Sequence, residues 1–292
     1  MLKREKLIKA LFTGSGVLSV VILLGIFFLL LYNSIPAFRR IGFWGFFGST
    51  VWNPTAYSRP AYGILSLIVS TLMVTAGAML ISIPLGIGCA VYLAEVASPS
   101  VREIVKPVIE ILAGIPSVVI GFLGIVLVGP AIAKIFNLYN GLNALNGSIL
   151  LAIMALPTII SISEDAISSV PREYRIASLA LGASKWQTIW KVTFPAALSG
   201  VIASIMLGVG RAVGETMTVL MATGNAPAFP TSFLDSVRTM TATIAIELGE
   251  VPYNTTHYYA LFVIGLVLFC ITFLVNLVSD AVLHRYEEKL GK

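Results

Sequence analysis

Residues 16–33 read GVLSVVILLGIFFLLLYN, a stretch without a single charged side chain. Wound as an α-helix at about 1.5 Å per residue, it would extend roughly 27 Å, close to the thickness of the hydrocarbon core of a bilayer. The whole 292-residue chain has the same character, with 57% hydrophobic residues, 11% charged residues and a mean hydropathy of +0.93. Soluble domains carry about 25% charged residues. The composition therefore disfavours a soluble, disordered or nucleic-acid-binding protein and indicates a polytopic membrane protein.

Six apolar stretches are long enough to cross a membrane, and the alternation typical of strands is absent. They cover residues 16–33, 64–94, 108–128, 147–163, 198–223 and 258–282. We therefore predict an all-α membrane protein with six transmembrane helices. The first stretch follows basic residues, as a signal peptide does, but no small-residue cleavage site comes after it, so we expect an uncleaved helix. Pro84 and Pro116 interrupt the second and third stretches, where we expect kinks.

Lys and Arg are distributed unevenly between the segments that join the six stretches. With the N-terminus inside, the inner segments hold thirteen of them and the outer loops hold five, while Arg211 falls within a stretch. Positive charge concentrates on the cytoplasmic side of membrane proteins. We therefore predict a multi-pass protein of the cytoplasmic membrane with both termini in the cytoplasm.

The side chains and motifs that most enzymes need are missing from the sequence. There is no P-loop pattern for ATP, and the two histidines, His257 and His284, lie at opposite ends of the last apolar stretch. Cys89 and Cys270 lie in apolar runs and are interpreted as small hydrophobic residues. We therefore expect no enzymatic activity and no metal or cofactor bound by this chain.

The longest polar insertion on the inner side, residues 164–197, is predicted to form two short helices at a bend. Pro171 suits the start of a helix that runs to residue 181, and Gly182 breaks it. A second helix is expected over 184–193, with Pro195 stopping it before the fifth stretch. We call residues 172–195 the knob.

Two interpretations of the knob follow from its side chains. Trp186 and Trp190 share one face of the second helix and would anchor an interfacial hairpin among lipid headgroups. A series of small residues, from Ala177 to Ala183, would instead let another protein surface approach closely. A docking site for a soluble partner accounts for both features, and we prefer it.

Residues 176–195 read IASLALGASKWQTIWKVTFP and resemble the cytoplasmic loop of bacterial ABC importer permeases, whose pattern begins E-A-A-x-x-x-G. Ile176 stands where that family has its glutamate. The resemblance implies that the knob is a coupling helix inserted into a groove of a separate ATPase, which would carry the ATP. The residues implied in this coupling are Ile176, Ala177, Ser178, Gly182 and Ala183.

The fifth stretch carries two charged residues, Arg211 and Glu215, near its middle. A charge at the bilayer centre costs at least about 2.5–3.5 kcal/mol. Residues four apart share a face of a continuous helix, so the two are expected to neutralise each other, either as a structural ion pair or in a substrate pathway. The Arg211 guanidinium matches a tetrahedral oxyanion. Glu215, if ionised, would accept a hydrogen bond from the protonated oxygen that hydrogen phosphate has and sulfate lacks. Gly208, Gly210 and Gly214 would let a partner helix or ligand come close.

Residues 207–217, LGVGRAVGETM, resemble phosphate-importer permeases of the Pst type, as do residues 83–88 and 113–121. With the long aromatic first outer loop, the resemblance favours the C-type subunit over the A-type. It implies a type I permease core related to the methionine importer permease, and a phosphate pathway lined by Arg211, Gly214, Glu215 and Thr216.

The same resemblance implies the partners and the division of the chain. The partners would be a second, A-type permease subunit, two ATPase subunits and an extracytoplasmic phosphate-binding protein, with membrane lipid around them. Residues 1–63 would form an N-terminal segment with the first helix and outer loop, and residues 64–292 a five-helix core containing the coupling loop 164–197. Two alternatives stay open: a permease for another oxyanion such as sulfate or molybdate, and an ion-coupled secondary transporter or channel.

Overall fold

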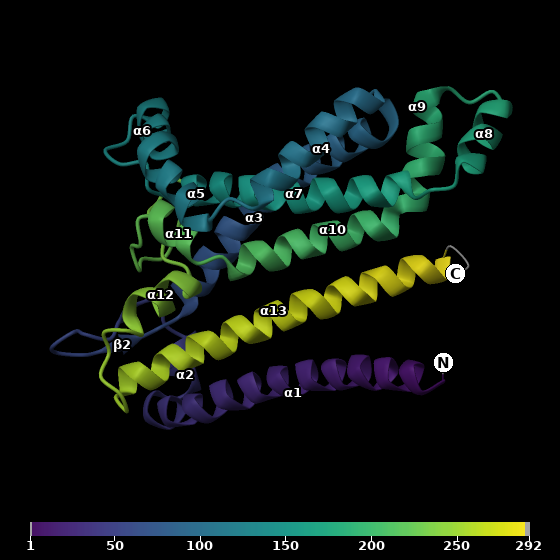
Figure 1. The fold of residues 1–292 in the computed structure, drawn as a ribbon. Coiled ribbons are helices and arrows are strands. Elements are labelled where there is room, and N and C mark those ends of the chain that lie inside the picture. The colour runs from purple at the N-terminus through teal and green to yellow at the C-terminus, as the bar shows by residue number, and fades with distance from the viewer. Residues whose placement is uncertain (1, 290–292) are drawn as a thin grey trace.

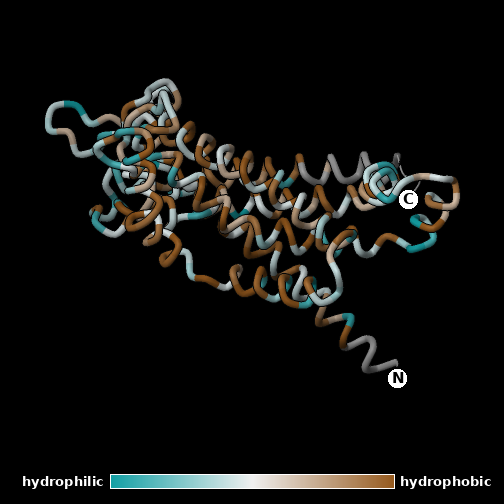
Figure 2. Tube along the Cα trace, turned by 90° about the horizontal axis from the view of Figure 1, so that it is seen from above, coloured by the Kyte–Doolittle hydropathy of each residue, from teal (hydrophilic) through white to brown (hydrophobic). Residues whose placement is uncertain are grey.

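In the computed structural model, which describes residues 2–289, long helices lie side by side and short elements gather at their ends (Figure 1). Within these residues, six helical stretches are long and apolar enough to cross a membrane, which confirms the predicted number. They are Ile8–Ile41, Leu65–Val96, Ser117–Phe136, Ala144–Ser168, Lys185–Gly214 and Thr256–Val278. Figure 2 shows hydrophobic residues along the helices and most hydrophilic ones towards the two ends.

The first half of the chain forms the first three of these stretches. Its elements are α1 (Leu2–Ile41), α2 (Phe43–Phe47), β1 (Trp52–Asn53), β2 (Ala61–Tyr62), α3 (Leu65–Val91), the π-helical turn η1 (Tyr92–Val96), α4 (Pro99–Ala113), α5 (Ser117–Leu123), the π-helical turn η2 (Gly124–Val128) and α6 (Gly129–Phe136). The two short strands pair antiparallel, with Trp52 opposite Tyr62.

The second half contains the knob and the remaining three stretches. Its elements are α7 (Ala144–Ser168), α8 (Arg172–Ala180), α9 (Lys185–Thr188), the π-helical turn η3 (Ile189–Thr193), α10 (Phe194–Gly214), α11 (Met217–Ala222), α12 (Met240–Glu247) and α13 (Thr256–Lys289).

The centre of the molecule is the contact between α3, α7 and α10. Ile159 of α7 is fully buried there, between Gly86 of α3 and Gly208 of α10. A Cβ atom placed on either glycine would lie 2.7 or 3.0 Å from the Ile159 side chain. Glycine at both positions therefore lets the three helices pack closely, as small residues do between membrane helices.

The third predicted span, 108–128, is wrong at its start. The structure ends α4 at Ala113, leaves Gly114–Pro116 non-helical and begins α5 at Ser117. Proline disfavours helical backbone in the residue before it, and the neighbouring glycine weakens the helix further. The kink expected at Pro116 is therefore a complete break, whereas Pro84 stays inside α3. The helical stretch that follows the break extends to Phe136.

The short elements are sorted between the two ends of the molecule. Both chain termini and the α8–α9 pair lie at one end, and α2, β2, α6 and α12 lie at the other (Figure 1). We call these the knob end and the far end. The arrangement agrees with a knob on the same side as both termini, and the assignment of that side to the cytoplasm stays a prediction.

Candidate functional site: a helix break and the knob

The fifth crossing is interrupted at the residues singled out in the sequence. The helix α10 ends at Gly214, Glu215 has extended backbone (φ −68°, ψ 134°) and α11 begins at Met217. The predicted continuous span 198–223 is therefore wrong. New hydrogen bonds replace the helical ones, because the Glu215 carboxylate accepts from the Thr218 amide at 3.2 Å and its carbonyl accepts from the Thr241 hydroxyl at 2.8 Å.

Arg211 and Glu215 do not form the ion pair expected of neighbours on one helix face. Among residues 2–289 no salt bridge joins them, since the break turns Glu215 away from the register of α10. Arg211 is exposed, and the one hydrogen bond that its side chain makes within residues 2–289 is a long bond of 3.4 Å from Nη1 to the Thr158 hydroxyl on α7. Arg211 also lies in the last turn of α10 and not mid-helix as predicted. Its guanidinium is thus available to a ligand.

The other predicted pathway residues lie around the same break. Gly214 is exposed, and a Cβ atom on Gly210 or Gly214 would meet nothing within 4 Å. Thr216 is half-buried, and its hydroxyl donates to the Gly214 carbonyl at 3.4 Å. Two of the three glycines therefore open one face of α10 beside Arg211, while Gly208 packs inside against Ile159.

The knob forms the two helices that the sequence predicts, with one difference. Gly182, at φ +86°, turns the chain between α8 and α9 in a conformation that favours glycine. A reciprocal capping box between Ser184 and Gln187 starts α9. Pro195, however, does not stop the helix: η3 widens the turn just before it, and the chain continues without interruption from Lys185 to Gly214. A π-helical turn can accommodate the missing proline amide, which the prediction did not allow for.

The predicted coupling residues lie together on the surface of the knob. Ile176 is 65% exposed, and Ala177 and Gly182 are exposed, while Ser178 and Ala183 are half-buried. A shallow hollow of about 530 Å³ lies between the two short helices, lined by Tyr174, Ala177, Ser178, Leu181, Ala183, Gln187, Lys191 and Val192. The lining of this hollow is thus mainly apolar.

An ion pair that sequence reasoning missed fastens the knob to the helix ends beside it. Arg175 of α8 donates to Glu95 of η1 through Nε at 2.9 Å and Nη2 at 2.6 Å. It also donates to the carbonyl of Ile167 in the last turn of α7 at 2.9 Å and to that of Val170, just after this helix, at 2.5 Å. The one signal in the sequence was Glu95, an isolated acid at the end of an apolar run.

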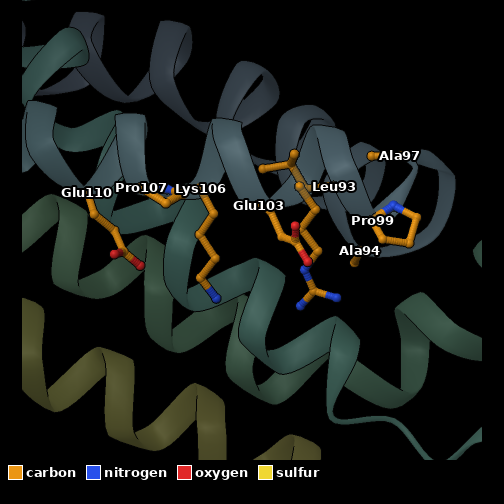
Figure 3. Close-up of a pocket in the computed structure, with 9 residues that line it drawn as sticks. Leu93, Ala94, Ala97, Pro99, Glu103, Lys106, Pro107 and Glu110 are labelled. Atoms are coloured by element: carbon orange, nitrogen blue, oxygen red, sulfur yellow. The ribbon is translucent and has the colours of Figure 1, made fainter.

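A second missed cluster ties α4 to α7 at the knob end. Glu164 is 1% exposed and accepts from Arg102, from Lys106 at 2.6 Å and from the Ser168 hydroxyl at 2.9 Å. Hydrogen bonds to Asp165 and then Glu164 raise the pKa of Lys106 above its usual 10.5, against the opposing effect of burial. Figure 3 shows Lys106 with Glu103 and Glu110 among the residues that line a cavity. The volume of this cavity is about 590 Å³. No residue of α4 is itself buried, so these charged contacts to the buried Glu164 are its main polar attachment to α7.

Comparison with known proteins gives one family over most of the chain. Residues 82–291 match the family described as "Binding-protein-dependent transport system inner membrane component". A probable ABC transporter permease, YqgH of Bacillus subtilis, is 42% identical over 78% of this chain and 74% of its own length. Phosphate transport system permease proteins PstC from Mesorhizobium japonicum and Haemophilus influenzae are 33% and 30% identical, over 95% and 99% of this chain and 89% and 96% of theirs.

Solved structures share the fold at lower identity. The chain is similar to an inward-facing MetNI methionine ABC transporter (TM-score 0.57, 19% identity, 77% of this chain and 94% of that one). It is also similar to a bacterial ABC transporter that imports alginate (TM-score 0.64, 15% identity, 98% and 99%). Both likenesses confirm the predicted permease fold.

Proposed function

Because this chain belongs to the family of binding-protein-dependent transport system inner membrane components, we propose that it is the permease subunit through which an ATP-driven importer passes inorganic phosphate. The observation that supports phosphate as the substrate is the near full-length similarity to phosphate permeases, one of which is 30% identical over 99% of this chain. The chain is a transport subunit and not an enzyme, so ATP hydrolysis belongs to a partner.

The break between α10 and α11 is the proposed place where phosphate passes. Arg211 is exposed and without a carboxylate partner among the described residues, and its planar fork can donate two hydrogen bonds to a tetrahedral oxyanion. Glu215 lies half-buried just beyond, and Gly214 and Thr216 leave room beside it. An ionised carboxylate there would accept a hydrogen bond from the protonated oxygen of hydrogen phosphate and would repel sulfate, which has no proton to donate.

The knob is the proposed coupling element between this break and the ATPase. The stretch Lys185–Gly214 contains 30 residues, so it is about 45 Å long at 1.5 Å per residue. It joins the knob to the turn of helix that carries Arg211 without a flexible linker. A displacement of the knob by an ATPase would therefore move Arg211 directly, and Ile176, Ala177, Ser178, Gly182 and Ala183 are the proposed contacts.

The remaining partners are the other subunits of an ABC importer that uses a binding protein. We propose a second permease subunit of the A-type, two ATPase subunits at the knob end and a phosphate-binding protein at the far end. This places both termini in the cytoplasm. It requires neither a metal nor a cofactor in this chain.

The test is transport by the purified complex in liposomes, with radiolabelled phosphate and the binding protein outside and ATP inside. We expect ATP-dependent phosphate uptake that excess sulfate does not reduce. Competition by sulfate or molybdate would instead assign a less selective oxyanion permease. Uptake by this chain alone, without ATP, would assign a secondary transporter or channel and overturn the proposal.

A further inference from the structure

A second polar cluster lies at the far end, outside the proposed pathway, and centres on Glu247. This carboxylate accepts from Trp52 Nε1 at 3.1 Å, from Arg238 Nη1 at 2.9 Å and from His257 Nε2 at 2.7 Å. Its side chain is 15% exposed, and those of Arg238 and His257 are 18% and 14% exposed. We call these four residues the far-end cluster.

The far-end cluster joins segments that are far apart in the sequence. Trp52 belongs to β1 in the loop after α1, Arg238 to the loop before α12 and His257 to the first turn of α13. Glu247 is the last residue of α12. Arg238 also donates through Nε to the Asn225 carbonyl at 2.8 Å, just beyond α11. The Glu247 carboxylate therefore fixes the end of α12 against the loop after α1, the loop before α12 and the first turn of α13.

The other end of α12 contacts the break. Thr241, in its first turn, donates to the Glu215 carbonyl at 2.8 Å, and the Met240 amide donates to the Thr71 hydroxyl of α3 at 3.0 Å. With eight residues, α12 is a rigid rod about 12 Å long. It has the far-end cluster at one end and the carbonyl of Glu215 at the other.

We propose that Glu247 is a positioning residue for transport: by holding α12 in the far-end cluster, it fixes the Glu215–Thr216 segment at the break. This inference rests on the proposed function in one respect, namely that phosphate passes at the break between α10 and α11. Loss of the Glu247 charge frees α12, and the segment that Thr241 holds then becomes mobile. A purely structural cluster would instead leave the break unchanged as long as the protein stays assembled.

The test measures exposure of the break without using phosphate. Thr216 is replaced by cysteine in the assembled complex, with the exposed Cys89 and Cys270 both replaced by alanine. The rate of reaction with a membrane-impermeant thiol reagent is then followed in nanodiscs, where both faces are accessible. Glu247→Gln should raise this rate about tenfold, the factor expected when a hydrogen bond to a charged group is lost.

A cavity of about 640 Å³ is lined by the four residues of the far-end cluster and by Glu250. Glu250 supplies the matched control, because it is an exposed carboxylate in the same lining. Within residues 2–289 its side chain has no hydrogen bond or ion pair, so Glu250→Gln should leave the rate unchanged. If Glu247→Gln fails to assemble, two milder variants replace it. Trp52→Phe removes the indole hydrogen bond to Glu247, and Arg238→Gln removes the ion pair with Glu247 and the bond to the Asn225 carbonyl. Each leaves the other partners of Glu247 in place and should raise the rate about threefold.

An unchanged labelling rate in an assembled Glu247→Gln complex, or in both Trp52→Phe and Arg238→Gln, overturns the inference. An increased rate together with absent phosphate uptake by the unmodified complex would reject the proposed function and leave the role of Glu247 standing.

Discussion

The pair Arg175–Glu95 allows a sharp test of how the knob is attached. The change is a double-mutant cycle: Arg175→Gln, Glu95→Gln and the two together. Their side chains are 19% and 9% exposed, so the pair is intermediate between an exposed ion pair and a fully buried one. Exposed ion pairs contribute about 0.2–1 kcal/mol, and removing one partner of a buried pair costs about 3–5 kcal/mol.

The size of each effect follows from the contacts that are lost. We expect a coupling free energy of about 1.5 kcal/mol between the two side chains. Glu95→Gln should therefore destabilise the protein by about 1.5 kcal/mol. Arg175→Gln should cost about 2.5 kcal/mol, because it also removes the bonds to the carbonyls of Ile167 and Val170. The double variant should be no less stable than Arg175→Gln alone, at about 2.5 kcal/mol.

The assay is thermal unfolding of the purified complex, followed together with ATP hydrolysis and phosphate import. For a chain of this size 1 kcal/mol corresponds to about 2 °C, so Arg175→Gln should lower the melting temperature by about 5 °C. It should also raise the ATP hydrolysed per phosphate imported, because a loosened knob moves without moving its neighbours. Arg172, exposed and without an ion pair among the described residues, is the control, and Arg172→Gln should change stability by less than about 0.5 kcal/mol. Strictly additive single effects in the double variant would refute an interaction between the two residues.

Two further predictions concern packing and pH. Gly208→Ala should lower the melting temperature, because crowding Ile159 costs about 1–3 kcal/mol and outweighs the gain in helix propensity, whereas Gly210→Ala, which meets open space, should raise it slightly. The reverse order in the melting curves would contradict this packing. Hydrogen bonds from the Thr231 amide, the Thr231 hydroxyl and then the Ser232 amide lower the pKa of Asp235 below its usual 3.8. Their stabilisation is therefore present above that value and lost only as pH falls through the lowered pKa, so the loop should not respond to pH between about 5 and 8. Asp235→Asn should reproduce the acid state at neutral pH and accelerate hydrogen exchange of the Ala144 amide, which donates to the Asp235 carbonyl at 3.0 Å; unchanged exchange would show that the carboxylate does not order this loop.

The number of helices was predictable because a chain in lipid must satisfy its own backbone hydrogen bonds, which favours long apolar helices. The knob was predictable for a different reason: Gly182 and the residues around it are local signals for a turn and a helix start. Their effect does not depend on the rest of the fold.

The break after Gly214 could not be predicted in this way. The Thr241 hydroxyl, distant in sequence, donates a hydrogen bond to the Glu215 carbonyl and so offsets the helical hydrogen bond lost at the break. The same limit explains the missed pairs, since Glu95 and Arg175 are separated by 80 positions. The sequence around Glu95 does not indicate which basic side chain will pair with it. Pro195 failed as a stop signal because η3 accommodates it, and a single sequence gives no warning of a π-helical turn.

The most direct test of the pathway is ATP-driven phosphate import by the complex carrying Arg211→Gln, at equal amounts of assembled complex. We predict import below a tenth of the unmodified rate, because loss of a charge-assisted contact to the anion costs about 1.5–3 kcal/mol or more. Arg40→Gln is the control, since Arg40 is exposed at the far end of α1, where it contacts Thr256. Import by Arg211→Gln at the rate of this control would contradict a phosphate route past Arg211.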